Sequence, residues 1–205
     1  MIMNKYPIMS ISPLRMASDG KGITTLIGLN GCPLDCKYCI NKTILKRNQF
    51  IEYSPMELYE RVKNHNLYYL ATGGGITFGG GEPLQYPQLI KDFKSICPNE
   101  WNINVETSLN VPLGNVQTTI GSVNHYYVDI KDINNKIYSE YTGKDNSQMV
   151  ENLKYLIENV NVDSITIRVP NIEKFNTKQD VSNSIDFLKS LGLKNFDIFD
   201  YITID

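Results

Sequence analysis

The chain has 205 residues and a formal net charge of −2, with 41% hydrophobic and 10% aromatic residues. This composition is ordinary for a folded globular domain and excludes an intrinsically disordered chain. The small net charge gives no global basic field for duplex nucleic acid, and no apolar run reaches membrane-spanning length. We therefore expect one domain over residues 1–205 that lies in the cytoplasm and binds neither nucleic acid nor membrane.

The first predicted strand covers residues 23–29, which are mostly β-branched or aliphatic and lie between glycines. A loop over residues 31–39 follows, and it contains three of the four cysteines of the chain. A helix is predicted next, at about residues 54–64. Its start is marked by Ser54 and Glu57, which are spaced as a capping box, and by Pro55 at the first helical position.

The rest of the chain alternates between predicted strands and helices. Strands are predicted at residues 75–78, 102–106, 125–130, 164–169 and 195–199. Helices are predicted near residues 87–96, 115–120, 136–141, 147–159 and 177–192. Such alternation indicates right-handed βαβ units and a parallel sheet, with no linker that would divide the chain.

Periodicity alone does not distinguish a doubly wound sheet from an incomplete barrel, but the polar residues do. They follow the predicted strand ends, and in barrel-like parallel sheets this carboxyl-terminal rim is where sites are built. We therefore expect an α/β fold, a partial (β/α)6 barrel with parallel strands. The residues at the strand ends are the cysteine loop, Gly80, Gly81, Glu82, Glu106, Thr107, Asp129, Lys131, Arg168 and Tyr201.

The spacing of Cys32, Cys36 and Cys39 is typical of metal ligands. Three thiolates this close cannot all pair as disulfides, and a short loop brings their sulfurs near one point, as soft metal centres require. A structural zinc site needs a fourth ligand nearby, whereas Cys97 and both histidines stand alone in sequence. An iron-sulfur cube held by three thiolates leaves one iron open to a small molecule. A non-catalytic zinc or iron-sulfur binding module is the alternative.

The pattern Cys-x-x-x-Cys-x-x-Cys, with Tyr38 before the last cysteine, resembles the signature of the radical S-adenosylmethionine (SAM) enzymes. The resemblance implies a [4Fe-4S] cluster on Cys32, Cys36 and Cys39 whose open iron binds SAM. The glycine-rich run at residues 79–83 resembles the Gly-Gly-Glu motif of the same superfamily, whose backbone binds the amino group of SAM. Glycines at such a turn let exposed backbone approach a ligand closely.

Three charged residues near strand ends are unusual for their positions. Asp129 and Lys131 alternate with apolar residues, so they share one face of their strand, and unpaired charges are costly if that face is a barrel lumen. Arg168 is a single cation in an otherwise β-branched strand, which favours a carboxylate partner. We interpret all three as site residues.

Several segments occur in the order and spacing seen in the activating enzymes of glycyl radical enzymes, and this resemblance covers nearly the whole chain. The segments that carry it are Asp19-Gly20-Lys21-Gly22-Ile23, the cysteine loop with Asn41, residues 73–77 running into Gly80-Gly81-Glu82, and Asp129-Ile130-Lys131. The resemblance implies a single radical SAM domain.

By position, the same resemblance implies roles for individual residues. Asp129 and Lys131 join the three cysteines as catalytic residues. The SAM site comprises Tyr38, Asn41, Gly80, Gly81, Glu82, Thr107, Asp129, Lys131, Arg168 and Tyr201. A monovalent cation beside SAM is expected on Glu106, Thr107 and Asp129, and the substrate is expected at Asp19, Gly20 and Gly22. The Asp19 segment precedes the first strand, so it reaches the site only if the chain folds back across the rim.

The implied activity is cleavage of SAM to a 5′-deoxyadenosyl radical that abstracts hydrogen from a polypeptide, at a glycine of a glycyl radical enzyme. One alternative is a radical SAM enzyme that modifies a ribosomal precursor peptide. Another is a radical SAM enzyme that modifies a small molecule, similar to the deazapurine synthases. A flavodoxin- or ferredoxin-type electron donor and a monomeric state are also expected. Activases commonly have Asp where Glu106 stands and His where Ile40 stands. No cysteine lies between Cys39 and Gly80, so we expect no auxiliary clusters.

Overall fold

The computed structural model describes residues 4–16 and 18–201, which form one eight-stranded sheet in the order β3-β1-β2-β4-β5-β6-β7-β8. The strands are β1 (Tyr6–Met16), β2 (Ile23–Leu29), β3 (Ile51–Tyr53), β4 (Gly75–Gly80), β5 (Asn102–Thr107), β6 (His125–Asp129), β7 (Ile165–Asn171) and β8 (Asn195–Asp200). The α-helices are α1 (Lys42–Arg47), α2 (Pro55–Val62), α3 (Asn66–Thr72), α4 (Pro87–Ile96), α5 (Leu113–Thr119), α6 (Asn135–Thr142), α7 (Ser147–Asn159) and α8 (Lys178–Ser190). Short 3₁₀ turns are η1 (Lys63–His65), η2 (Pro83–Gln85) and η3 (Val162–Ser164).

The six predicted strands are all present and are parallel to one another, from β2 through β4, β5, β6 and β7 to β8. The sheet is open, since its outer strands β3 and β8 do not pair with each other, and this arrangement agrees with an incomplete barrel. The predicted α/β fold with a partial barrel is therefore confirmed.

Two strands were not expected from the sequence. β1 pairs antiparallel with β2, and the short β3 pairs antiparallel with the first residues of β1. Pro7 and Pro13 argue against a strand because proline lacks an N–H. An edge strand tolerates proline, which accounts for Pro13, whereas Pro7 lies opposite Glu52 in the short stretch that β3 covers. Over most of its length β1 is such an edge, since β3 covers only Tyr6 to Ile8.

Local sequence signals explain where the helices begin and end. The capping box at the start of α2 is formed, with the Ser54 side chain accepting from the Glu57 amide and the Glu57 side chain accepting from the Ser54 amide. Thr177 and Asp180 form a second capping box at the start of α8. The short helices α1 and α3 were missed, because neither has an apolar face to signal it: α1 buries none of its residues and α3 buries only Tyr69. None of the described helices is long and apolar enough to cross a membrane.

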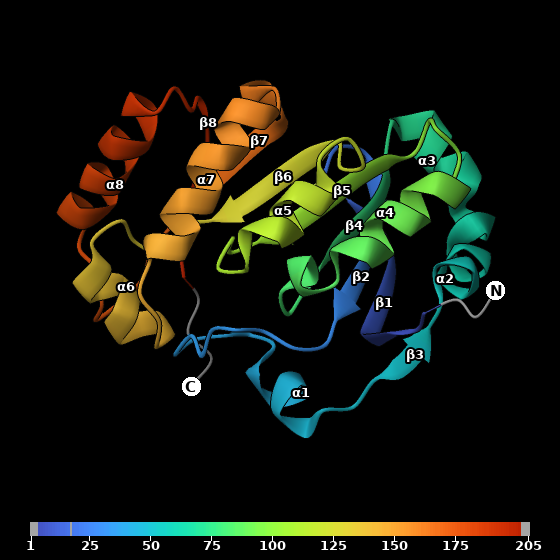
Figure 1. Cartoon of the computed structure of the whole chain (residues 1–205), viewed down its shortest axis with the longest axis horizontal. Helices are drawn as coiled ribbons and strands as arrows, with labels where there is room; N and C mark the ends of the chain where they lie inside the picture. The colour runs from blue at the N-terminus through green and yellow to red at the C-terminus, as the bar shows by residue number, and fades with distance from the viewer. Residues whose placement is uncertain (1–3, 17, 202–205) are drawn as a thin grey trace.

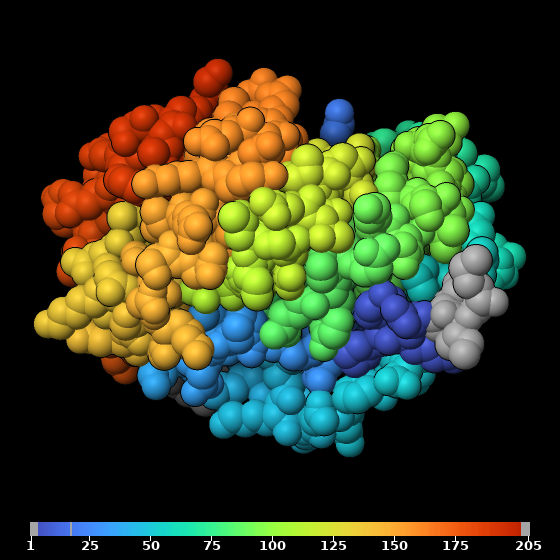
Figure 2. Space-filling model, in the orientation of Figure 1, coloured from blue at the N-terminus to red at the C-terminus, as the bar shows by residue number. Residues whose placement is uncertain are grey.

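The strands present different side chains to the two faces of the sheet. Ile76, Val105 and Ile167 belong to the buried apolar core, and α4, α5 and α7 lie in front of the sheet in Figure 1. Figure 2 shows these helices covering that face, with the cysteine loop and α1 along its lower margin. Polar side chains, such as Glu106 and Arg168, alternate with the apolar ones and line a cavity.

Candidate functional site

A cavity of about 680 Å³ lies at the carboxyl ends of the parallel strands. This volume falls within the range of roughly 300–1,000 Å³ that is usual for small-molecule sites. The residues predicted from the sequence that line it are Asp19, Cys32, Cys36, Cys39, Asn41, Gly80, Gly81, Glu82, Glu106, Thr107, Asp129, Lys131, Arg168 and Tyr201. Segments far apart in sequence therefore meet in one place, which we call the site cavity.

Cys32, Cys36 and Cys39 are half-buried free thiols that line the site cavity. Their loop is held in place by backbone hydrogen bonds to the end of α6, where the amides of Asp35 and Lys37 donate to carbonyls at 2.9 and 3.1 Å. Burial raises the pKa of Cys32 to about 12 and the pKa of Cys36 to about 11. As bare thiols these groups stay protonated at neutral pH, whereas a bound metal centre stabilises the thiolate form.

The three thiols line one cavity, but among the described residues they do not meet at one point as their spacing led us to expect. In the part of the chain that the structure describes, no three His, Cys, Asp or Glu side chains gather around one point closely enough to hold a metal ion. A structural zinc site needs all of its ligands around one such point. In a cluster each cysteine binds a different iron, so three thiols on one cavity wall suit a cluster with one open iron.

The end of β4 is a turn that only glycine can form. Gly80 has φ +91°, and a Cβ on it would lie 2.6 Å from the side chain of Met9. A Cβ on Gly81 would lie 2.1 Å from the carbonyl oxygen of Gly31. Asn41 donates a side-chain hydrogen bond of 2.7 Å to the Gly80 carbonyl. The glycines therefore allow the turn to pack directly against the end of β2 and the cysteine loop, and they leave room beside the site cavity.

Glu82 is buried, and both of its carboxylate oxygens accept hydrogen bonds from the protein. Its donors are the Thr107 hydroxyl at 2.7 Å, the Ser108 amide at 2.8 Å and hydroxyl at 2.6 Å, and the Leu84 amide at 3.1 Å. Burial raises the pKa of Glu82, and these donors oppose that change. The carboxylate thus ties the ends of β4 and β5 together, which positions the walls of the site cavity.

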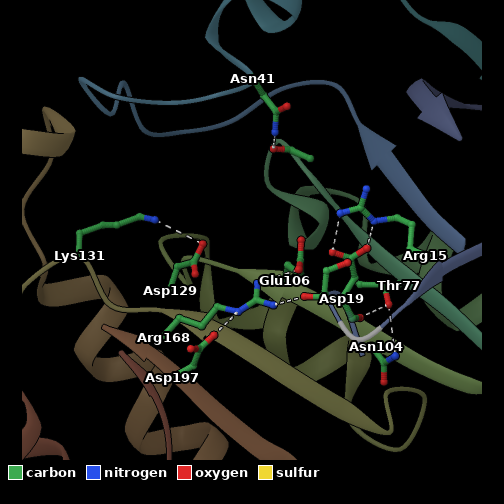
Figure 3. Close-up of polar contacts among 12 residues, drawn as sticks. Arg15, Asp19, Asn41, Thr77, Asn104, Glu106, Asp129, Lys131, Arg168 and Asp197 are labelled. Atoms are coloured by element: carbon green, nitrogen blue, oxygen red, sulfur yellow. Dashed lines mark hydrogen bonds and ion pairs between the residues drawn. The ribbon is translucent and has the colours of Figure 1, made fainter. Parts of the chain in front are cut away.

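A row of charged side chains crosses the sheet from β5 to β8 (Figure 3). Arg168 pairs with Glu106 at 2.7 Å and with Asp197 at 3.7 Å, and its guanidinium lies 4.8 Å from the ring centre of Tyr127. The neighbouring strands are in register here, because Arg168 lies opposite Asp129 on β6 and Asp197 on β8. Arg168 has the carboxylate partner that the sequence predicted.

Lys131 pairs with Asp129 at 3.3 Å, although it lies beyond the end of β6. Burial alone would lower the pKa of Lys131, but Asp129, Tyr201 and Cys36 outweigh burial and raise it. Lys131 therefore stays positively charged beside the thiols. Burial raises the pKa of Glu106, whereas Arg168 opposes this change.

The segment before β2 folds back into the site cavity, as the sequence required for a role there. Asp19 pairs with Arg15 of β1, and its carbonyl accepts a hydrogen bond of 2.5 Å from Thr77 of β4 (Figure 3). Arg168 donates a 3.0 Å hydrogen bond to the carbonyl of Ser18. The Asp19 carboxylate is therefore held by Arg15, while Thr77 and Arg168 fix the backbone of residues 18 and 19 at the site cavity.

Three predicted residues do not line the site cavity. The Tyr38 ring packs edge-on against Tyr141 and Phe175, with centroids 6.1 and 5.6 Å away. Gly20 and Gly22 instead allow close packing, since a Cβ would lie 2.5 Å from Asn104 or from the Thr72 carbonyl, respectively. Their roles at the SAM and substrate sites stay predictions.

Sequence reasoning missed Arg15 and Asp197, which also line the site cavity. Arg15 lies on β1, which was not predicted because it contains two prolines. Asp197 lies opposite Arg168 on β8, and the alternation of that strand could have indicated its face.

The profile of the radical SAM superfamily matches residues 26–201, from β2 to the end of the described chain. The chain therefore belongs to the radical SAM superfamily, and membership implies a [4Fe-4S] cluster and SAM. The chain is 30% identical over 164 residues to the pyruvate formate-lyase-activating enzyme of Clostridium pasteurianum, covering 76% of this chain and 69% of the relative. It is 24% identical over 258 residues to the choline trimethylamine-lyase activating enzyme of Oleidesulfovibrio alaskensis, covering 96% and 82%.

Two solved structures share the fold. Streptococcus suis SuiB, bound to its precursor peptide SuiA, matches with a TM-score of 0.63 and 15% identity, over 83% of this chain and 37% of SuiB. The enzyme anSMEcpe with bound AdoMet matches with a TM-score of 0.57 and 16% identity, over 85% of this chain and 50% of that one. At such low identity the likeness concerns the fold alone. Together the comparisons favour the activating enzymes over the alternative functions.

Proposed function

We propose that this chain is an activating enzyme that abstracts a hydrogen atom from a backbone glycine of a partner polypeptide, a glycyl radical enzyme. The observation that carries the proposal is the site cavity, whose lining combines three free thiols with Asp19. Both relatives named above are themselves activating enzymes.

In this proposal Cys32, Cys36 and Cys39 hold the [4Fe-4S] cluster. When bound, the reduced cluster and SAM together supply the one-electron chemistry that removes a hydrogen atom from carbon. Lys131 and Arg168 place two cations on the cavity wall, where they can orient the carboxylate of SAM. Asp129 can accept from its amino group, and the turn at Gly80 and Gly81 leaves space for both.

A polypeptide can reach this site from the side. Residues of β1, such as Ser12, and residues of β8, such as Phe199, line the same cavity. Yet the two strands do not pair with each other, so the sheet is open between them. An extended segment of a partner can enter through such an opening, with Asp19 and the neighbouring backbone available for hydrogen bonds.

A monovalent cation beside SAM is part of the proposal, on Glu106, Thr107 and Asp129, whose oxygens suit such an ion. Glu106 and Asp129 already pair with Arg168 and Lys131, so we expect SAM affinity to depend only weakly on the ion. Exchange of potassium for tetramethylammonium at constant ionic strength tests this expectation, and a large loss of SAM affinity would contradict it. We also propose a monomer that works in the cytoplasm and receives electrons from a flavodoxin- or ferredoxin-type donor.

The test of the proposed function uses cysteine variants of the anaerobically reconstituted protein. The wild type should bind about four irons, as expected of one cube, and should release 5′-deoxyadenosine from SAM when reduced. Replacing Cys32, Cys36 or Cys39 with alanine should abolish both iron binding and SAM cleavage. Cys97→Ala is the matched control, because Cys97 is a buried thiol away from the site cavity. Loss of the cluster in the control but not in the three variants would refute the assignment.

A further inference from the structure

A strongly basic stretch follows the second cysteine of the loop. Four of the twenty lysine and arginine residues of the chain fall between residues 37 and 47, and no acidic residue occurs between Asp35 and Glu52. The whole chain, in contrast, has a net charge of −2. These four cations, which we call the basic segment, are Lys37, Lys42, Lys46 and Arg47.

Most of this charge is free to interact with a partner. Lys37, Lys46 and Arg47 are exposed, and within residues 4–16 and 18–201 none of the three takes part in an ion pair. Lys42 pairs with Asp35 at 3.0 Å. Lys46 and Arg47 lie in the last turn of α1, where the helix dipole stabilises positive charge. None of the residues of α1 is buried. The helix therefore contributes a surface rather than core packing.

Large apolar side chains are exposed among these cations. Ile40 is 70% exposed and Ile44 is 41% exposed, and the chain continues to Phe50 and Ile51, which are 40% and 62% exposed. Exposed apolar groups rimmed by charge are typical of protein-protein interfaces, in which an apolar centre is buried and the polar rim stays wet. The combination thus favours a folded protein as the partner.

The basic segment lies on the same loop as the thiols of the site cavity. The Lys42 amide donates to the carbonyl of Cys39 at 3.1 Å, so α1 begins directly at the third cysteine. Ile40 and Leu45 line the site cavity, whereas Lys37, Lys46 and Arg47 do not. One side of the loop therefore faces the predicted cluster, and its basic side faces solvent.

We propose that the basic segment and the apolar side chains beside it are the docking surface for an acidic one-electron carrier protein. The inference rests on the proposed function, because it assumes a cluster on the three cysteines. The carrier gives up one electron and the cluster gains it, with no transfer of atoms. Opposite charges steer such encounters and speed association at low salt, and small interfaces suffice for electron transfer. The proposed polypeptide entry lies elsewhere, between β1 and β8.

The test is direct binding of an oxidised acidic flavodoxin to the reconstituted protein by titration calorimetry. The double variant Lys46→Glu/Arg47→Glu should bind about tenfold or more weakly, because like charges then face each other. Wild-type affinity should also fall as salt is raised. Lys91→Glu/Lys154→Glu is the matched control, since both lysines are exposed on α4 and α7, in the helical layer of Figure 1. Equal affinity of the wild type and the first variant would overturn the proposal.

A kinetic measurement separates donor docking from substrate docking. With reduced flavodoxin, the Lys46→Glu/Arg47→Glu variant should form 5′-deoxyadenosine about tenfold more slowly at limiting donor, while photoreduced deazariboflavin should restore the wild-type rate. If the variant instead loses radical transfer to a polypeptide under chemical reduction, the surface binds substrate and the proposal is wrong. Absence of SAM cleavage by chemically reduced wild type would refute the proposed function, and the binding titration would still decide the docking surface.

Discussion

Asp129 lies next to both cations of the site cavity, Lys131 and Arg168. It pairs with Lys131 at 3.3 Å, and it lies across the strand pair from Arg168. Asp129→Ala should leave the iron content unchanged, because Asp129 is not one of the three cysteines that are proposed to bind the cluster. It should weaken SAM binding about tenfold, or by ~1.4 kcal/mol, because a charged partner is lost. Calorimetric titration with SAM, alongside an iron assay, measures both effects. Unchanged SAM affinity would remove Asp129 from the site.

Some residues of the site could be predicted from the sequence alone, and others could not. The cysteines, Asp129 and Arg168 could be predicted because their chemistry is unusual for their positions. Glu82 was predicted as a cofactor residue, but its burial under four hydrogen-bond donors depends on contacts with β5 that no local pattern encodes. Tyr38 was predicted next to SAM, yet its ring joins an aromatic cluster with helix α6, a contact that only the tertiary fold creates.

Among the elements, the glycine turn after β4 gives a sharp prediction. Gly81→Ala would place a Cβ 2.1 Å from the Gly31 carbonyl, so it should reduce the free energy of unfolding by roughly 1–3 kcal/mol and weaken SAM binding. Gly114→Ala in α5 is the control, because no atom lies within 4 Å of its added Cβ. It should raise the free energy of unfolding by about 0.5–1 kcal/mol. Denaturant unfolding measures both, and equal effects would contradict the packing argument.

The segment before β2 gives the second prediction at this scale. Asp19→Ala should leave uncoupled SAM cleavage unchanged and reduce radical transfer to a polypeptide about tenfold, because the polypeptide loses one polar contact worth ~1.4 kcal/mol. Arg15→Gln should act in the same direction, since Arg15 holds the Asp19 carboxylate. Product analysis with and without polypeptide measures the two activities separately. Parallel loss of both would assign Asp19 to the SAM site instead.

The elements themselves differ in how well the sequence predicts them. The parallel strands are short apolar runs between turn residues, and all six could be located within a few residues. β1 could not, because Pro7 and Pro13 both oppose a strand, and the edge position that tolerates Pro13 is known only from the structure. The three-residue β3 exists only through its pairing with β1. The short helix α3 has no side-chain N-cap and buries only Tyr69, so the local sequence gives little signal for it.

At the scale of the whole molecule, the open sheet connects fold and proposed function. Its helical face is covered, as Figure 2 shows, while the other face has a row of charges that ends at the thiols. β1 and β8 do not pair with each other, so the polypeptide entry proposed above lies at this opening of the sheet.

The most direct measurement is electron paramagnetic resonance of the reduced, reconstituted enzyme incubated with SAM and a glycyl radical enzyme. The account predicts a glycyl radical signal on the partner polypeptide, formed together with an equal amount of 5′-deoxyadenosine. The signal should be absent when any of Cys32, Cys36 and Cys39 is replaced by alanine. Turnover of a free nucleobase or sugar, with no radical on any protein, would contradict the account.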